Sequence, residues 1–166
     1  TNKPKPFYYS EKTKFARYLQ SKKIFKIEEN DKLISYTPIY HSLAQRISFL
    51  AINSFSTLYI VKKFNADSYI KTIFNNKINV LFPVSSHLRL ILFKLKDKKI
   101  NFLKLIVGSS SDLSLTIKKD LFKRFKNKFV ETYGMSETAF LTILDFNGYK
   151  KNYVKSVGKP CYNVKI

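Results

Sequence analysis

The sequence has little of what several protein classes depend on. It contains one cysteine among 166 residues, which excludes a disulfide framework and a cysteine-rich zinc or iron–sulfur site. Four glycines and five prolines are too few for a collagen-like or low-complexity chain. The longest apolar neighbourhood, residues 47–61, is too short and polar to span a membrane. The first residues lack an apolar signal core, so we expect a soluble, cytoplasmic protein.

Acidic residues are also scarce: 11 oppose 31 basic residues, which gives a formal charge of +20. Such a charge is typical of nucleic-acid binding. However, 27 of the basic residues are lysines and only four are arginines, whereas recognition of phosphates and base edges favours the planar guanidinium. The lysines also accompany many residues with AT-rich codons. We therefore interpret the charge as a solvated basic surface and keep a nucleic-acid-binding module as the less favoured alternative.

The composition that remains supports a folded core, since 45% of the residues are hydrophobic and 16% are aromatic. Hydrophobic periodicity predicts helices at residues 10–23, 42–53, 68–76 and 114–125, and another from Pro83 toward Leu95. Asp67 and Ser114 are the expected caps of two of them. Apolar runs predict strands at residues 33–36, 57–61 (a buried strand), 78–82, 103–107 and 128–132. A turn at 133–134 and a short helix near Glu137 are expected next, and then a turn and a strand within 157–166.

This alternation of strands and helices predicts an α/β fold with a doubly wound, mostly parallel sheet flanked by helices. No internal repeat or linker divides the chain, so we expect one continuous unit. Ligands of such sheets bind outside the carboxyl ends of the strands. Two polar segments at that edge, residues 108–112 and 133–138, are therefore candidates for a binding site.

The second segment, Tyr-Gly-Met-Ser-Glu-Thr, contains the groups that nucleotide binding needs. Gly134 allows a tight turn and leaves the Tyr133 ring free to stack on a base. Ser136 provides a hydroxyl for a phosphate oxygen. Glu137 provides a carboxylate oxygen of the kind that holds Mg²⁺ against phosphates. The alternative is an ordinary strand end followed by a capped helix.

Other chemistries have little support in the sequence. His41 and His87 lack the spacing and companion ligands of a zinc site. The run Gly-Ser-Ser-Ser-Asp is not a nucleophile elbow, and no glycine-rich dinucleotide fingerprint is present. Cys161 is expected to be an inert, packed thiol. No covalent nucleophile is therefore predicted.

Four segments, residues 1–5, 38–41, 133–138 and 156–160, occur in an order and spacing that resemble the adenylate-forming (AMP-binding) superfamily of acyl-CoA synthetases and AMP-dependent ligases. The resemblance covers residues 1–166 but only the central part of that family's large N-terminal domain. It implies a fragment whose small C-terminal domain is absent. It also implies an enzyme that activates a carboxylic acid with ATP as acyl-AMP and then transfers the acyl group to a thiol.

The resemblance implies roles for individual residues. His41, Ser136 and Glu137 are the expected catalytic residues, with His41 acting as a gate and Glu137 binding Mg²⁺. The residues expected to bind ATP or AMP are Thr1, Lys5, Ser110, Ser111, Asp112, Glu131, Thr132, Tyr133, Gly134 and Ser136. The residues expected to line the acyl pocket are Tyr40, His41, Ser109 and Met135.

The implied cofactors are ATP, Mg²⁺ and coenzyme A, or carrier-protein phosphopantetheine in place of coenzyme A. The segment after Pro38 lacks the aspartate that pairs with a substrate ammonium group in amino-acid-activating relatives, which favours an acid without an α-amino group. An amino-acid or acyl-carrier-protein adenylation domain and an inactive, truncated remnant remain as alternatives. Because the resemblance places the family's ribose-binding aspartate and catalytic lysine beyond residue 166, the isolated fragment is expected to be inactive.

Overall fold

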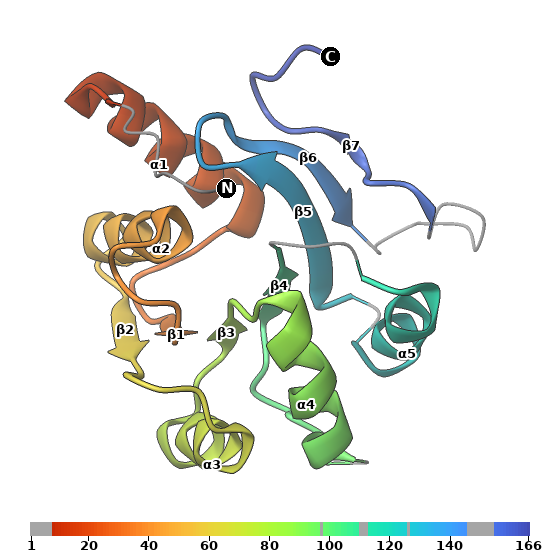
Figure 1. Cartoon of the computed structure of the whole chain (residues 1–166). Helices are drawn as coiled ribbons and strands as arrows, with labels where there is room; N and C mark the ends of the chain where they lie inside the picture. Colours follow the sequence, from red (N-terminus) through yellow and green to blue (C-terminus); the bar gives the residue numbers. More distant parts are fainter. Residues whose placement is uncertain (1–7, 97, 110–112, 126, 146–154) are drawn as a thin grey trace, which may run out of the picture.

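The computed structural model describes residues 8–96, 98–109, 113–125, 127–145 and 155–166 (Figure 1). The helices are α1 (Glu11–Phe25), α2 (Ser42–Asn53), α3 (Ala66–Asn76), α4 (Ser85–Leu95) and α5 (Leu115–Phe125). The strands are β1 (Lys32–Ser35), β2 (Thr57–Ile60), β3 (Val80–Leu81), β4 (Leu105–Gly108), β5 (Phe129–Met135), β6 (Ala139–Asp145) and β7 (Lys159–Pro160). Within these described ranges, no helix is both long and apolar enough to cross a membrane.

The strands form one sheet in the order β2-β1-β3-β4-β5-β6-β7. The first five strands of this order are parallel, and β6 and β7 are antiparallel to their neighbours. Helices α3, α4 and α5 cover one face of the sheet, and α1 and α2 cover the other (Figure 1). The predicted α/β fold, a doubly wound and mostly parallel sheet flanked by helices, is confirmed.

Two hydrophobic cores hold these layers together, one on each face of the sheet. Successive strand residues point to opposite faces, so Leu33 packs in the core under α1 and α2, whereas Ile34 packs in the core under α3 and α4. Both side chains are fully buried. The central strands β3 and β4 are apolar on both sides because helices cover both faces of the sheet there.

Three local predictions were wrong. The strand near residue 57 was expected to be buried, but β2 lies at the edge of the sheet, and Ile60 is 61% exposed. Asn65 caps α3 by accepting a hydrogen bond from the amide of Ser68, while Asp67 lies in the first turn and pairs with Lys94. The turn and short helix expected around Glu137 are instead the end of a β-hairpin.

This hairpin extends the sheet beyond the parallel strands. β5 continues to Met135, turns through residues 136–138 and returns as β6. The apolar and β-branched run Phe140–Ile143 fits a pleated, half-buried surface, and Phe140 and Thr142 of this run are buried. β6 was not predicted, because the polar segment before it resembles the start of a helix.

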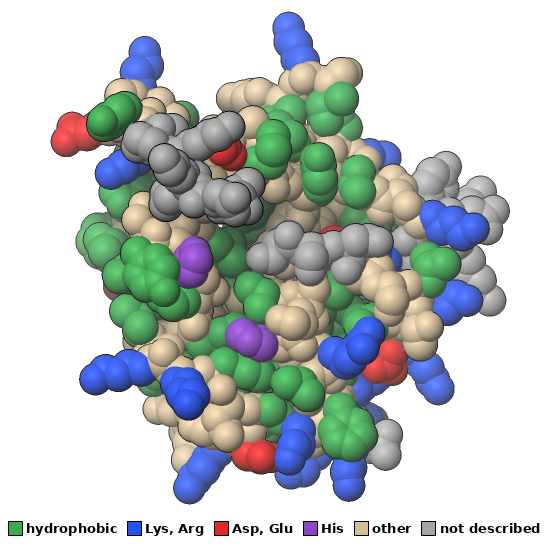
Figure 2. Space-filling model, viewed as in Figure 1, with side chains coloured by type: hydrophobic (Ala, Val, Ile, Leu, Met, Phe, Trp, Pro, Cys, Tyr) green, Lys and Arg blue, Asp and Glu red, His purple; other side chains and the backbone are tan. Residues whose placement is uncertain are grey.

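The basic residues do not gather into one stripe on the face shown in Figure 2. Lysine and arginine side chains are spread around the periphery of that face, with apolar and neutral groups between them. The interpretation of the +20 charge as a solvated surface stays a prediction.

Candidate functional site

A cavity of about 260 Å³ lies at the carboxyl edge of the sheet, between α2 and the β5–β6 hairpin. β4 ends at Gly108, whereas its parallel neighbour β5 continues past that point, so the hairpin forms one wall. The cavity is lined by Ser42, Leu43, Arg46, Ser109, Thr132, Gly134, Met135, Ser136 and Phe140. Its position is the one expected for a ligand site in a doubly wound sheet.

Five of the predicted site residues meet around this cavity: Ser109, Thr132, Gly134, Met135 and Ser136. Thr132 is buried, and its hydroxyl donates a hydrogen bond to the carbonyl oxygen of Gly108 at 3.2 Å. This bond fixes the end of β4 against β5. Hydroxyl groups from β5 and from the segment after β4 therefore share one small space.

The Ser136 side chain and backbone are both anchored. Its hydroxyl lies 2.8 Å from the hydroxyl of Ser42, the first residue of α2. Its carbonyl oxygen accepts hydrogen bonds from the guanidinium of Arg17, at 3.2 Å, and from the Tyr9 hydroxyl. Arg17 also donates to the carbonyl oxygen of Glu137. The hairpin turn is thus held to α1 and α2 at the point where it meets the cavity.

The two hairpin strands approach each other closely at Gly134, and this close approach requires a residue without a side chain. The register of the hairpin shifts between Tyr133 and Gly134, which marks an irregularity of the kind that re-aims side chains. A Cβ atom on Gly134 would lie 1.9 Å from the carbonyl oxygen of Ala139. A tight turn after the strand was predicted at this glycine, but Gly134 lies inside β5.

Glu131 points to the opposite side of β5 from the cavity. Its carboxylate forms an ion pair with Lys118 of α5, with 2.7 Å between Oε2 and Nζ. The two side chains are only 10% and 3% exposed. This ion pair joins the sheet to α5, and the nucleotide contact expected of Glu131 stays a prediction.

Tyr133 and Glu137 lie near the cavity without lining it. Tyr133 is 50% exposed, so its ring is accessible to a planar ligand. Glu137 is exposed and borders a groove between α1 and the C-terminal segment, together with Arg17 and Tyr162. Tyr133, Ser136 and Glu137 therefore all lie at the end of one hairpin. Ser136 lines the cavity, Glu137 borders the groove, and Tyr133 is half-exposed.

The carboxylate of Glu137 is the type of ligand that binds Mg²⁺ beside a nucleotide. Mg²⁺ bound with a nucleotide commonly takes one or two carboxylates, with phosphate and water oxygens completing its shell. The described ranges contain no cluster of three His, Cys, Asp or Glu side chains, so an all-protein metal site is not built there.

Cys161 is buried, and burial raises its pKa to about 11, which leaves little thiolate at neutral pH.

His41 and Tyr40 lie just before α2 at the same edge of the sheet. Both are exposed, and their rings are in contact, with centroids 4.6 Å apart. His41 is the N-cap residue of α2 but makes no side-chain capping bond, and Ser42 beside it lines the cavity. The remaining predicted residues, Thr1, Lys5, Ser110, Ser111 and Asp112, lie outside the described residues.

The comparison with known families agrees with this geometry. A family model described as AMP-binding enzyme matches residues 1–166. The chain belongs to this family of AMP-binding enzymes. Its curated relatives include the medium/long-chain-fatty-acid–CoA/3-oxocholest-4-en-26-oate–CoA ligase of Mycobacterium tuberculosis (strain ATCC 25618 / H37Rv), which is 30% identical over 118 residues. That match covers 67% of this AMP-binding chain and 22% of the relative, about a fifth of its length.

Solved structures of AMP-binding enzymes share the fold. The o-succinylbenzoate CoA synthetase of Bacillus subtilis, in complex with AMP, superposes with a TM-score of 0.88 at 18% identity. The superposition covers 98% of this chain and 33% of the synthetase. ATP-bound MatB from Rhodopseudomonas palustris gives a TM-score of 0.72 at 20% identity, over 81% of this chain and 27% of that structure.

The site of this AMP-binding chain also contains arginine residues that the sequence did not predict. Arg46 of α2 lines the cavity, and its guanidinium carbon lies 4.4 Å from the centre of the Phe140 ring. Burial, together with the smaller effect of the nearby Arg17 charge, lowers the pKa of Arg46 to about 10. Two of the four arginines of the chain therefore lie at this site. The rarity of arginine among so many lysines is the feature of the sequence that could have indicated them.

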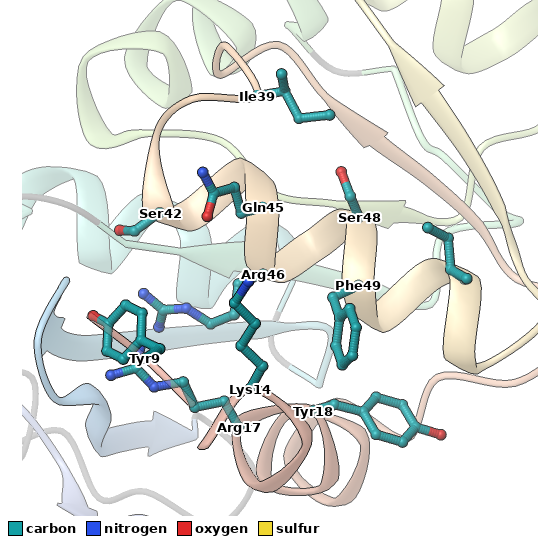
Figure 3. A pocket seen from close by; sticks show the side chains of 11 residues that line it. Tyr9, Lys14, Arg17, Tyr18, Ile39, Ser42, Gln45, Arg46, Ser48 and Phe49 are labelled. Carbon is teal, nitrogen blue, oxygen red and sulfur yellow. The ribbon is translucent and has the colours of Figure 1, made fainter. Parts of the chain in front are cut away.

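Arg46 also lines a second, adjoining cavity of about 370 Å³ between α1 and α2 (Figure 3). Arg17 and Lys14 reach into this cavity from α1, and Tyr9 lies beside both arginines (Figure 3). Its other wall is largely apolar and includes Tyr18, Ile39, Phe49 and Ile52. The second cavity thus combines a cationic end with an apolar wall.

Proposed function

We propose that the chain is part of an AMP-forming acid–thiol ligase, which activates a carboxylic acid as acyl-AMP and transfers the acyl group to coenzyme A. The observation that carries this proposal is the cavity where Ser42, Thr132 and Ser136 present hydroxyl groups at the carboxyl edge of the sheet. The ligase activity named for the mycobacterial relative supports it. Phosphopantetheine on a carrier protein is the alternative acceptor.

In this proposal the chain contributes mainly position and charge. The first step forms a bond between a carboxylate oxygen of the acid and the α-phosphorus of ATP and releases pyrophosphate. Such a transfer asks the protein to align the reactants and to stabilise charge on the phosphate oxygens. The Ser136 hydroxyl, fixed by Ser42 at 2.8 Å, donates to an α-phosphate oxygen. Because Arg17 and Tyr9 hold the carbonyl of Ser136, its hydroxyl is positioned before the ligand arrives.

The flanking motif residues complete the nucleotide site. The exposed Tyr133 ring offers a face on which adenine stacks, and this contact needs no rearrangement of the buried part of β5. Glu137 would hold Mg²⁺, which supplies charge neutralisation at the phosphates when bound. His41 and Tyr40, both exposed beside α2, border the entrance used by the acid. Thr1, Lys5 and residues 110–112 are proposed to add phosphate and adenine contacts.

The experiment is ATP–pyrophosphate exchange by the full-length parent, tested with fatty, aryl and amino acids. We expect exchange with acids that lack an α-amino group, and a loss of about 10- to 100-fold in kcat/KM for Ser136→Ala, the range typical of a hydrogen bond to a charged group. Ser136→Thr keeps the hydroxyl and is the matched control, expected to retain most of the activity.

The same assay separates the alternatives. Exchange that depends on amino acids alone would identify an amino-acid adenylation domain. Absence of exchange with every acid would leave an inactive remnant and contradict the proposal. The isolated 166-residue chain is expected to give no exchange above background, because the proposed parent supplies the catalytic lysine from elsewhere.

A further inference from the structure

Two arginines approach each other at the junction of the two cavities. Arg17 extends from α1, with its guanidinium carbon 3.7 Å above the Tyr9 ring, and Arg46 extends from α2 onto the Phe140 ring. Lys14 lines the same space (Figure 3). Three cationic side chains from two helices therefore border one cavity.

No carboxylate in the described part of the chain lies within salt-bridge distance of either arginine. Two lysines elsewhere in the described chain that are buried or half-buried are each paired with an acid. Lys118 pairs with Glu131, and Lys104 pairs with Asp31 at 2.6 Å. The arginines at the cavity instead contact aromatic rings and backbone carbonyl oxygens.

This arrangement leaves uncompensated positive charge next to a cavity. Burial and the neighbouring Arg17 charge both disfavour the charged form of Arg46, which is why its pKa is lowered. The attraction of a bound anion would offset both effects, and a guanidinium binds a carboxylate through two parallel hydrogen bonds. The free-energy gain is largest for an anion that reaches the partly buried Arg46.

The geometry relates this charge to the proposed acid site. Arg46 lines both the cavity that contains Ser136 and the cavity with the apolar wall. An acid with one carboxyl group at Ser136 can therefore extend toward Arg46, with its carbon chain against side chains such as Phe49. Its far end then lies beside the two guanidinium groups. A fatty acid would place an uncharged methyl end there.

We propose that Arg46 and Arg17 form a subsite for a second anionic group of the acid, so that the preferred substrates are dicarboxylic acids rather than simple fatty acids. This inference rests on the proposed function, since it concerns the acid that the ligase would activate. Arg46 is the principal ligand, and Arg17 contributes charge while it holds the hairpin turn.

The test is calorimetric titration of the 166-residue chain at neutral pH with glutarate and adipate, and with butyrate and hexanoate as monocarboxylates of similar length. We expect at least one dicarboxylate to bind about tenfold or more tightly than its monocarboxylate counterpart. Arg46→Gln is expected to weaken dicarboxylate binding about 10- to 100-fold and monocarboxylate binding less, so that the preference for dicarboxylates is lost.

Two variants serve as controls. Arg46→Lys keeps the charge but loses the planar fork, so it is expected to restore part of the preference. Arg89→Gln removes the same charge from an exposed position on α4 and is expected to bind like the wild type. A purely structural role of Arg46 against Phe140 would not give this separation between di- and monocarboxylates.

The inference is overturned if dicarboxylates and monocarboxylates bind equally, or if Arg46→Gln does not change the preference. Displacement of the dicarboxylate by an equal concentration of inorganic pyrophosphate would identify a polyphosphate site and would overturn it as well. AMP binding is measured on the same samples. Wild type that binds AMP without any dicarboxylate preference contradicts this inference alone, whereas wild type that fails to bind AMP contradicts the proposed function too.

Discussion

Lys118→Met is expected to lower the free energy of unfolding by about 3–5 kcal/mol, because it removes one partner of a buried ion pair. The Lys118 ammonium lies 2.7 Å from the Glu131 carboxylate, and the side chains are 3% and 10% exposed. Methionine preserves most of the apolar volume, so the expected loss comes from the lost ion pair rather than from a cavity. Urea denaturation followed by circular dichroism measures the difference.

The neighbouring lysine supplies the control. Lys119 is exposed on the same helix, and Lys119→Met is expected to stay within about 0.5 kcal/mol of the wild type. The double variant Lys118→Met with Glu131→Gln removes both charges and is expected to recover part of the loss. A single variant Lys118→Met as stable as Lys119→Met would show that the pair is not buried as described.

Gly134→Ala is expected to destabilise the protein by about 3 kcal/mol, the upper end of ordinary overpacking effects. The added Cβ would lie 1.9 Å from the carbonyl oxygen of Ala139, and this obstacle is backbone in the opposite strand of the hairpin. The hairpin must open to admit the methyl group, which also displaces Ser136. We therefore expect loss of AMP binding together with loss of stability.

Gly108→Ala is the matched control for this substitution. A Cβ at Gly108 would lie 2.9 Å from Cζ of Phe129, a side-chain atom whose ring can shift. Its expected cost is therefore smaller, about 1 kcal/mol. Equal destabilisation by the two substitutions, measured by the same denaturation experiment, would contradict the close backbone approach at Gly134.

The sequence predicted those parts of the fold that depend on local patterns. Helix α2 occupies the predicted residues Ser42–Asn53, because its apolar positions recur at helical spacing. The parallel order followed from the alternation of strands and helices. The β5–β6 hairpin was missed because its pairing depends on contacts that residue patterns do not state: Met135 pairs with Ala139 across the polar turn.

The candidate site divides in the same way. Ser109, Thr132 and Ser136 could be expected to meet, because each follows or ends a strand at the same edge of the sheet. The position of Arg46 depends on how α1, α2 and the hairpin pack together. Helical periodicity alone predicts only on which face of α2 the residue lies. Glu131 belongs to the recognised motif region, yet strand alternation turns it toward α5 and Lys118.

The central claim is that the cavity beside Ser136 binds the nucleotide, and NMR titration of the ¹⁵N-labelled 166-residue chain with AMP tests it most directly. The amide shifts are predicted to change at Ser109 and at residues 132–137, around the Ser136 cavity. A different result, with changes confined to the basic groove formed by Lys98, Lys123 and Lys128, would show only charge-driven phosphate binding and would contradict the claim.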